Sequence, residues 1–372
     1  MQKNCLAQRN QSENASSQSA QETRVLNAAD AKADGQVALV GFELQFPAMG
    51  TLVQLKTFAR SESEVERGFN AAQRRVLEIA NTLTDYDPES ETRQLSQLAV
   101  ESPQNVSADL WAVLTASDDW YRRTDGHFDS SLGSLTRLWR KYRRVRRVPN
   151  SEAVQTALQN SGWKYVRLDP SAKTLKFARA NVFLDFGGIG KGYIVDEAFR
   201  VLVEHDLPQS LVNISGNMRM GTAPPNRNGW NIEVAPIEAN PKSEKEGAAG
   251  EPLQRLELCD CSIATSGDLW QYIEINGVRH SHILDPQTGY GVPGPISATV
   301  IAQRAMDADA LATAACILPK AKAITLCQNS DAACLVARRV GKELQVDRST
   351  TFPQPPNEPP TAEGTDPSNV PN

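Results

Sequence analysis

An alanine-rich segment near the C-terminus holds two residues with the types and spacing of a cation site, Asp309 and Thr313. Residues four apart lie on one face of a helix, and the alanines around them leave room for a ligand to approach. A carboxylate and a hydroxyl are hard oxygen donors of the kind that Mg²⁺ prefers. The spacing alone also allows Thr313 to bond back to its own helix while Asp309 is solvated.

A glycine-rich loop is a second candidate site. Residues 187–192 read GGIGKG, after a strand-like run and before a helical pattern. In that order, backbone amides and the Lys191 ammonium could meet a phosphate at the N-terminus of a helix. The loop matches neither GxxxxGK[ST] nor GxGxxG, so glycines that only allow tight packing remain an equal alternative.

Histidine could supply a general base. His280 and His282 alternate in HSHILDPQTGYG, and alternate positions of a strand share one face. His282 is the candidate base, with Asp285 as its candidate orienting partner. A hydrogen-bonded structural histidine is the alternative.

The composition narrows the classes of partner. The 372 residues carry 39 basic and 44 acidic side chains, a net charge of −5, which argues against a protein that coats nucleic acid. We expect no nucleic-acid partner, and we interpret the basic run over residues 140–147 as a solvated face. The six cysteines do not form two CxxC pairs, so neither a zinc ribbon nor a dense disulfide framework is expected. No apolar run is long enough for a membrane span.

The order of predicted elements gives the fold class. A hairpin over 42–55 precedes helices over 61–83 and 107–124, and three strand-like runs over 164–186 lead through GGIGKG into another helix. Several strands follow, then the alanine-rich helix, a helix starting at Pro319 and a closing strand pair. This pattern predicts one α/β (α+β) domain, in which helices flank a mostly antiparallel sheet.

Both ends of the chain read as disordered arms. Residues 1–36 are rich in Gln, Asn, Ser and Ala, and residues 352–372 are polar and rich in proline. The folded domain is therefore predicted over residues 37–351. The start lacks the basic and apolar pattern of a signal peptide; if a signal preceded it, Cys5 could carry a lipid anchor.

Eight segments, in order along residues 46–338, resemble the ApbE family, the FAD:protein FMN transferases and related flavin-processing proteins. They are PAMGT at Pro47, LTDYDPESETRQL at Leu83, GHFDSSLGSLTRLW at Gly126, LDFGGIGKGYIVD at Leu184, LVNISGNMRMG at Leu211, SIATSGD at Ser262, SHILDPQTGY at Ser281 and ATVIAQRAMDADALATA at Ala298. Their shared order makes the resemblance far stronger than any one segment would.

The resemblance implies a single ApbE-like domain that binds FAD in a cleft, with Mg²⁺ beside the pyrophosphate. The cation would be held by Asp309, Thr313 and the backbone carbonyl of Gly188, and His282 would lie near the reacting phosphate. The residues implied to contact FAD are Met49, Thr84, Asp85, Tyr86, Asp129, Lys191 and Ile283.

The reaction implied by the resemblance splits FAD and joins FMN, through its phosphate, to a Thr or Ser hydroxyl of an acceptor flavoprotein, with AMP as the leaving group. Two alternatives stay open: an FAD pyrophosphatase, which uses water in place of the hydroxyl, and a non-catalytic flavin-binding protein. Relatives commonly act in the periplasm or anchored to a membrane, whereas this sequence shows no signal peptide, so its compartment is left open.

The sequence departs from the family pattern at two places. Ser215-Gly216-Asn217 stands where GGD or GGN is usual, and RKYRRVRRVP follows LTRLW where glycine and phenylalanine are common. We expect the first change to keep its loop and the second to affect how the acceptor protein docks.

Overall fold

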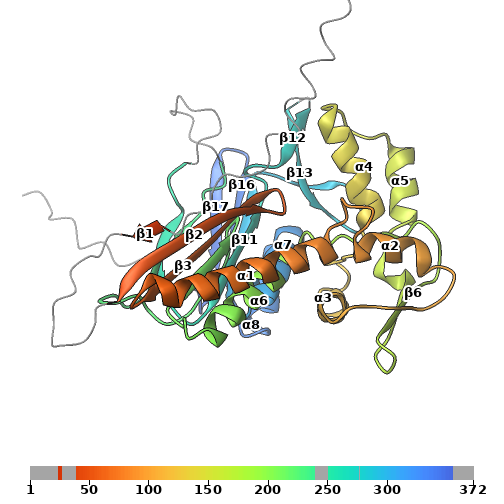
Figure 1. The fold of residues 1–372 in the computed structure, drawn as a ribbon. Helices are drawn as coiled ribbons and strands as arrows, with labels where there is room; N and C mark the ends of the chain where they lie inside the picture. The colour runs from red at the N-terminus through yellow and green to blue at the C-terminus, as the bar shows by residue number, and fades with distance from the viewer. Residues whose placement is uncertain (1–23, 27–38, 239–249, 276, 355–372) are drawn as a thin grey trace, which may run out of the picture.

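The computed structural model describes residues 24–26, 39–238, 250–275 and 277–354. Its centre is a nine-stranded sheet in which every neighbouring pair is antiparallel (Figure 1). In spatial order the strands are β1 (Arg24–Leu26), β2 (Val40–Ala48), β3 (Thr51–Ala59), β7 (Ser210–Ile214), β8 (Asn217–Met220), β11 (Ser262–Gly267), β15 (Ile296–Ala302), β16 (Ala333–Val340) and β17 (Glu343–Arg348). The predicted fold class, mixed helix and antiparallel sheet, is confirmed.

Helices cover one face of this sheet. Those that pack on it or on one another are α1 (Glu62–Leu83), α6 (Gly190–Glu204), α7 (Ala305–Ile317) and α8 (Lys320–Gln328). The apolar positions of α1, at the helical spacing expected from the sequence, are buried from Val65 to Leu83. The predicted helices at 61–83 and 305–317 are therefore confirmed.

Alternate residues of the sheet point into a second core on the opposite face. In β16, Cys334 and Val336 belong to the helix-side core, whereas Leu335 and Ala337 belong to the second core. The second core is closed by a two-stranded ribbon of β9 (Trp230–Val234) and β10 (Gln254–Leu258). Both faces of the sheet are therefore buried from water, which explains why the sequences of its strands are continuous apolar runs.

A smaller set of elements lies at one end of the sheet (Figure 1). It comprises α2 (Glu91–Leu98), β4 (Gln104–Asn105), α3 (Ala108–Arg123), α4 (Gly133–Arg144), α5 (Ser151–Gln159), β5 (Val166–Asp169), β6 (Thr174–Phe177), β12 (Tyr272–Ile275), β13 (Val278–Leu284) and β14 (Gly291–Pro293). Strands β4, β6 and β5 form one small sheet, and β12, β13 and β14 form another. Three of the helices start at side-chain caps, because Ser90, Ser107 and Asn150 each accept a backbone N–H of the first turn.

One expectation about the elements is wrong. The run over 182–186 is not a strand; it makes a single parallel bridge between Leu132 and Phe183. There, a contact from a distant part of the chain decides the conformation.

The predicted arms fall mostly outside the described residues, as do Cys5 and most of the polar insertion between β9 and β10. Two parts of the arms are described. Arg24–Leu26 pairs with β2, and the Phe352 side chain is buried in the second core. Because an aromatic side chain buries a large apolar area, the folded part continues at least to Phe352, one residue past the predicted end. Within the described residues, the structure contains no helix that is both long and apolar enough to cross a membrane.

Candidate functional site

The candidate site is built on the junction between α6 and α7. An added Cβ on Gly192 would lie 2.3 Å from the Ala305 carbonyl oxygen, so only glycine lets the two helix starts meet this closely. The backbone N–H of Gly192 donates to Asp309 Oδ2 at 3.0 Å. Asp196 of α6 in turn accepts the N–H groups of Ala305 and Met306, at 2.8 and 2.9 Å, and so caps α7.

This junction brings together the residues predicted to hold a cation. An added Cβ on Gly188 would lie 3.0 Å from Thr313 Oγ1, so the glycine loop lies directly against that hydroxyl. The Thr313 hydroxyl is 3.1 Å from Ser266 Oγ of β11. Lys191 Nζ lies 3.9 Å from Asp309 Oδ1 and donates to the Gly187 carbonyl oxygen at 2.8 Å.

The donor set fits a hard divalent cation. Asp309 is 2% exposed, and burial raises the pKa of its carboxyl against the opposing effect of Lys191. Its Oδ1 makes no hydrogen bond within the described residues, because Lys191 is too far away to donate one. The solvated Asp309 that spacing alone allowed is thus excluded. No group of three or more His, Cys, Asp or Glu in the described part of the chain could hold a metal, so a cation here would also need Thr313, carbonyl, water or phosphate oxygens.

His282 lies on β13 and is oriented by the backbone. Its Nδ1 is 3.0 Å from the Gln271 carbonyl oxygen, which can only accept, so the imidazole carries its proton on Nδ1 and leaves the Nε2 lone pair free. The predicted orienting partner, Asp285, is wrong, because its Oδ1 accepts from the N–H of Gln287 in its own turn. Burial, aided by the charges of Arg143 and Lys191, lowers the pKa of His282 to about 4.

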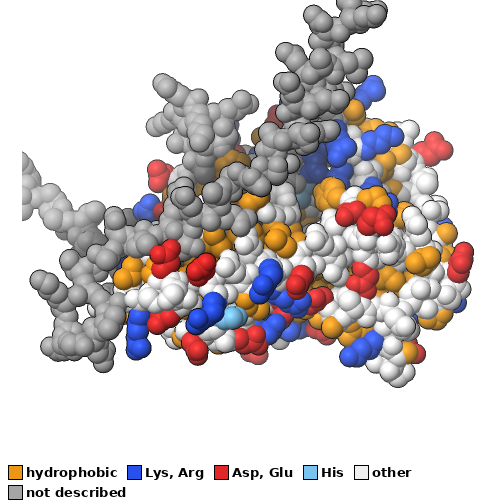
Figure 2. Space-filling view, in the orientation of Figure 1, with side chains coloured by type: hydrophobic (Ala, Val, Ile, Leu, Met, Phe, Trp, Pro, Cys, Tyr) orange, Lys and Arg blue, Asp and Glu red, His pale blue; other side chains and the backbone are white. Residues whose placement is uncertain are grey.

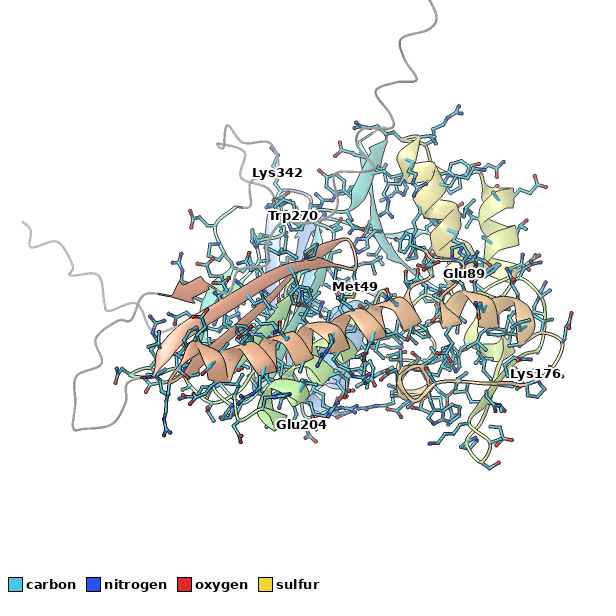
Figure 3. All side chains as sticks on the ribbon, in the orientation of Figure 1. Met49, Glu89, Lys176, Glu204, Trp270 and Lys342 are labelled. Carbon is cyan, nitrogen blue, oxygen red and sulfur yellow. The ribbon has the colours of Figure 1, made fainter. Side chains whose placement is uncertain are left out.

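Met49 occupies the turn of the β2–β3 hairpin. Ala48 pairs with Thr51, which leaves Met49 and Gly50 as a two-residue turn with φ of +52° and +69°. The Met49 side chain is 38% exposed, and Figure 3 shows it at the end of the sheet that faces α4 and β13. The turn therefore presents a thioether at this end of the molecule.

The segment after α1 is held by a cluster of charges. Arg140 of α4 pairs with Asp85 at 2.6 Å and with Asp185 at 2.7 Å, and its guanidinium lies 4.4 Å from the centre of the exposed Tyr86 ring. Thr84 Oγ1 accepts the N–H of Tyr86 at 3.2 Å. At Arg140 the cluster corrects the reading of residues 140–147 as a solvated face, because Arg140 bridges two nearly buried carboxylates. Most other basic residues of the run are exposed, as that reading predicts.

Two other residues predicted to contact FAD make hydrogen bonds to other groups of the protein. Asp129 accepts hydrogen bonds from the N–H and hydroxyl of Ser131 and from the N–H of Trp163, at 2.5 to 3.0 Å. The Ile283 side chain is buried, and its N–H donates to Ser281 Oγ at 3.1 Å. The roles of both residues in binding FAD stay predictions.

The sequence alone did not indicate the roles of Arg140, Asp185 and Asp196. Asp185 directly precedes the glycine loop, which was a usable signal, but nothing local links it to Arg140. A hollow of about 680 Å³ between α4 and α5 is lined by none of the predicted site residues. It borders the site at Arg137, which lies 3.8 Å from Asp85.

Comparison with known proteins decides the family. The family model described as "ApbE family" matches residues 49–336, most of the chain. The chain belongs to the ApbE family. An FAD:protein FMN transferase of Treponema pallidum is 28% identical over 293 residues, covering 75% of this chain and 79% of the relative.

Solved ApbE structures agree with this fold. The ApbE protein of Thermotoga maritima is 27% identical with a TM-score of 0.73, over 84% of this chain and 98% of that one. The flavinyl transferase ApbE of Pseudomonas stutzeri, in its apo form, is 25% identical with a TM-score of 0.72, over 86% and 98% of the two chains. The family predicted from the collinear motifs is confirmed.

Proposed function

We propose that this ApbE protein is an FAD:protein FMN transferase that moves FMN from FAD to a Thr or Ser hydroxyl of an acceptor flavoprotein, with Mg²⁺ and with release of AMP. The observation that carries the proposal is the convergence of Gly188, Asp309 and Thr313 beside Lys191 at the start of α6. The names of the relatives support the overall reaction.

The proposed step is one displacement at phosphorus. The acceptor hydroxyl oxygen attacks the phosphorus of the FMN half, the new P–O bond forms, and the bond from that phosphorus to the bridging oxygen breaks. AMP leaves with that bond's electron pair. His282 Nε2 takes the hydroxyl proton, for which the Nδ1 contact to Gln271 leaves it free.

The cation would be held by Asp309 Oδ1, Thr313 Oγ1 and the Gly188 carbonyl. Mg²⁺ bound there would neutralise charge on the pyrophosphate oxygens. Lys191, already within 3.9 Å of Asp309, adds a second positive charge at the N-terminal end of α6, where the helix dipole also favours an anion. Met49, Thr84, Asp85, Tyr86, Asp129 and Ile283 are the remaining proposed contacts of FAD.

Product analysis separates this proposal from its two alternatives. The purified protein is incubated with FAD, Mg²⁺ and a candidate acceptor; the acceptor is weighed intact by mass spectrometry, and AMP and FMN are separated by chromatography. A covalent FMN adduct together with AMP supports the transferase. AMP and free FMN without an adduct indicate a pyrophosphatase, and bound FAD without AMP indicates a non-catalytic flavin-binding protein.

The cation assignment has its own test. Asp309→Asn removes the charge that would bind Mg²⁺ while keeping the shape of the side chain, so AMP release should lose its dependence on Mg²⁺ concentration and fall. Asp331→Asn, an exposed aspartate in a turn, is the matched control and should follow the wild-type curve. A wild-type Mg²⁺ response in Asp309→Asn would place the cation elsewhere.

A further inference from the structure

One ridge of side chains on helix α4 lies beside the candidate site. It is formed by Arg137, Trp139, Arg140 and Arg143. Trp139 donates from Nε1 to the Gly289 carbonyl oxygen at 2.8 Å, and its ring centre lies 5.8 Å from that of His280 on β13. Arg140, the next residue, pairs with Asp85 and Asp185. Arg143 follows these two by four and three positions, so it lies on the same face, one turn further along.

Arg143 differs from the other arginines of this ridge because it has no counter-ion. Arg140 has its two carboxylates, and Arg137 lies 3.8 Å from Asp85. In the described part of the chain, the Arg143 side chain makes no ion pair or hydrogen bond, although it is only partly exposed. Burial and the neighbouring charge of Arg140 lower the pKa of its guanidinium, which shows that the charge is poorly compensated.

Arg143 has no counter-ion near the site. Asp85 and Asp185 pair with Arg140, Arg137 lies 3.8 Å from Asp85, and Lys191 lies 3.9 Å from Asp309, whereas no carboxylate of the described residues pairs with Arg143. After the larger effect of burial, the charges of Arg143 and Lys191 both lower the pKa of His282, so both lie near the candidate base. A partly buried cation without a partner is costly, and an anionic ligand would remove that cost.

We propose that Arg143 binds a phosphoryl oxygen of the FAD pyrophosphate in the candidate site. The proposal rests on the proposed function, and it adds a residue from the RKYRRVRRVP segment, where this chain departs from the usual family pattern. Figure 2 shows Lys and Arg side chains gathered over α4 at the upper right. Arg144 is exposed, whereas Arg143 is only partly exposed.

The test compares Arg143→Gln with Arg144→Gln, two changes that remove the same charge from adjacent residues. The dissociation constants of FAD and of riboflavin, which has no phosphate, are measured by flavin fluorescence at several salt concentrations. We expect Arg143→Gln to weaken FAD binding about tenfold and to reduce its salt dependence, because one charge-assisted hydrogen bond is lost. Arg144→Gln should bind FAD as wild type does, and riboflavin binding should be the same in all three proteins.

Three outcomes would overturn the assignment. The first is wild-type FAD affinity in Arg143→Gln. The second is an equal loss of FAD and riboflavin binding, which would indicate damage to the flavin pocket. The third is unchanged FAD binding with a raised KM for the acceptor, which would assign Arg143 to an acidic group of that protein.

The proposed function fails separately from this assignment. If wild type binds FAD but gives no adduct, the transferase proposal falls, while the affinity comparison still decides the role of Arg143. If wild type forms the adduct and Arg143→Gln binds FAD normally, only the Arg143 assignment falls.

Discussion

The bond between His282 Nδ1 and the Gln271 carbonyl gives one imidazole its tautomer without any carboxylate. A backbone carbonyl carries no full charge, so it fixes the ring's orientation while leaving the imidazole pKa low. A neutral ring at this position can accept a proton but does not repel the cations around it. This suits the proposed base, which would work beside Lys191 and the proposed divalent ion.

Replacement of His282 by Gln should separate chemistry from binding. We expect the rate of FMN transfer to fall by about 10²- to 10⁴-fold, because the base that takes the hydroxyl proton is lost. FAD affinity should change little. His205→Gln, at the exposed C-terminal end of α6, is the control. Unchanged transfer in His282→Gln, measured by adduct mass in single-turnover experiments, would show that another group is the base.

The pH dependence of kcat/KM should report the protonation of His282 in the free enzyme. Because the pKa of His282 is about 4, the ring is neutral, and able to act as base, at every pH well above that value. The acid limb assigned to this group should therefore have its midpoint near pH 4, with no loss of rate between about pH 8 and 6. A midpoint near 6.5, the ordinary histidine value, would contradict it, provided that circular dichroism shows a folded protein.

At the scale of elements, the site depends on how closely α6 approaches α7. Gly192 fixes that approach by lacking a side chain, and Asp309 and Asp196 join the two helices by hydrogen bonds in both directions. The same Asp309 is the proposed cation ligand. Helix packing and site geometry are therefore one feature of the molecule.

Gly192→Ala should force helices α6 and α7 apart. Its Cβ would meet backbone atoms of Ala305 and Met306, which cannot rotate away, so we expect a loss of about 2–4 kcal/mol in the free energy of unfolding and weaker FAD binding. Gly190→Ala, in the same turn, is the control, because its Cβ would meet only side-chain atoms, of Phe186 at 3.3 Å and of Leu83 at 3.6 Å. Denaturant unfolding measures both; equal small losses would argue against a tight junction.

Elements whose signals are local were predicted from sequence, and those that depend on distant partners were not. The hairpin that carries Met49, the α1 pattern and the helix after GGIGKG are local, and each is present. The third strand-like run was wrong because Leu132 decides its conformation, and the basic run was wrong at Arg140, which pairs with two aspartates 45 and 55 residues away. Spacing placed Asp309 and Thr313 on one helix face, but only the family resemblance added Gly188 to them.

Across the whole molecule, the sheet is buried on both faces, and the chain's last described segment closes the second core. Phe352 is 1% exposed there, and Gln254 Nε2 donates to the Pro353 carbonyl oxygen at 2.8 Å. The end of the domain is thus fixed by an aromatic side chain packed beneath the sheet. The sequence did not indicate this contact, because the proline-rich composition of residues 352–372 predicts disorder.

Two truncations test this end of the domain. A chain that stops after Gln354 keeps Phe352 and should unfold like the full chain. A chain that stops after Thr351 loses a fully buried phenylalanine, and we expect a cost of about 3–5 kcal/mol. Thermal and denaturant unfolding measure the difference; equal stability of the two chains would show that Phe352 contributes no core packing.

The two partners of the Gly192–Asp309 hydrogen bond are 117 residues apart in the chain, and the strands between α6 and α7 must first take their places in the sheet. Contacts between such distant residues form slowly, because the intervening loop must close before they are gained. During synthesis, the site cannot exist until α7 has emerged. A fragment of the chain that ends before α7 would therefore lack the candidate site.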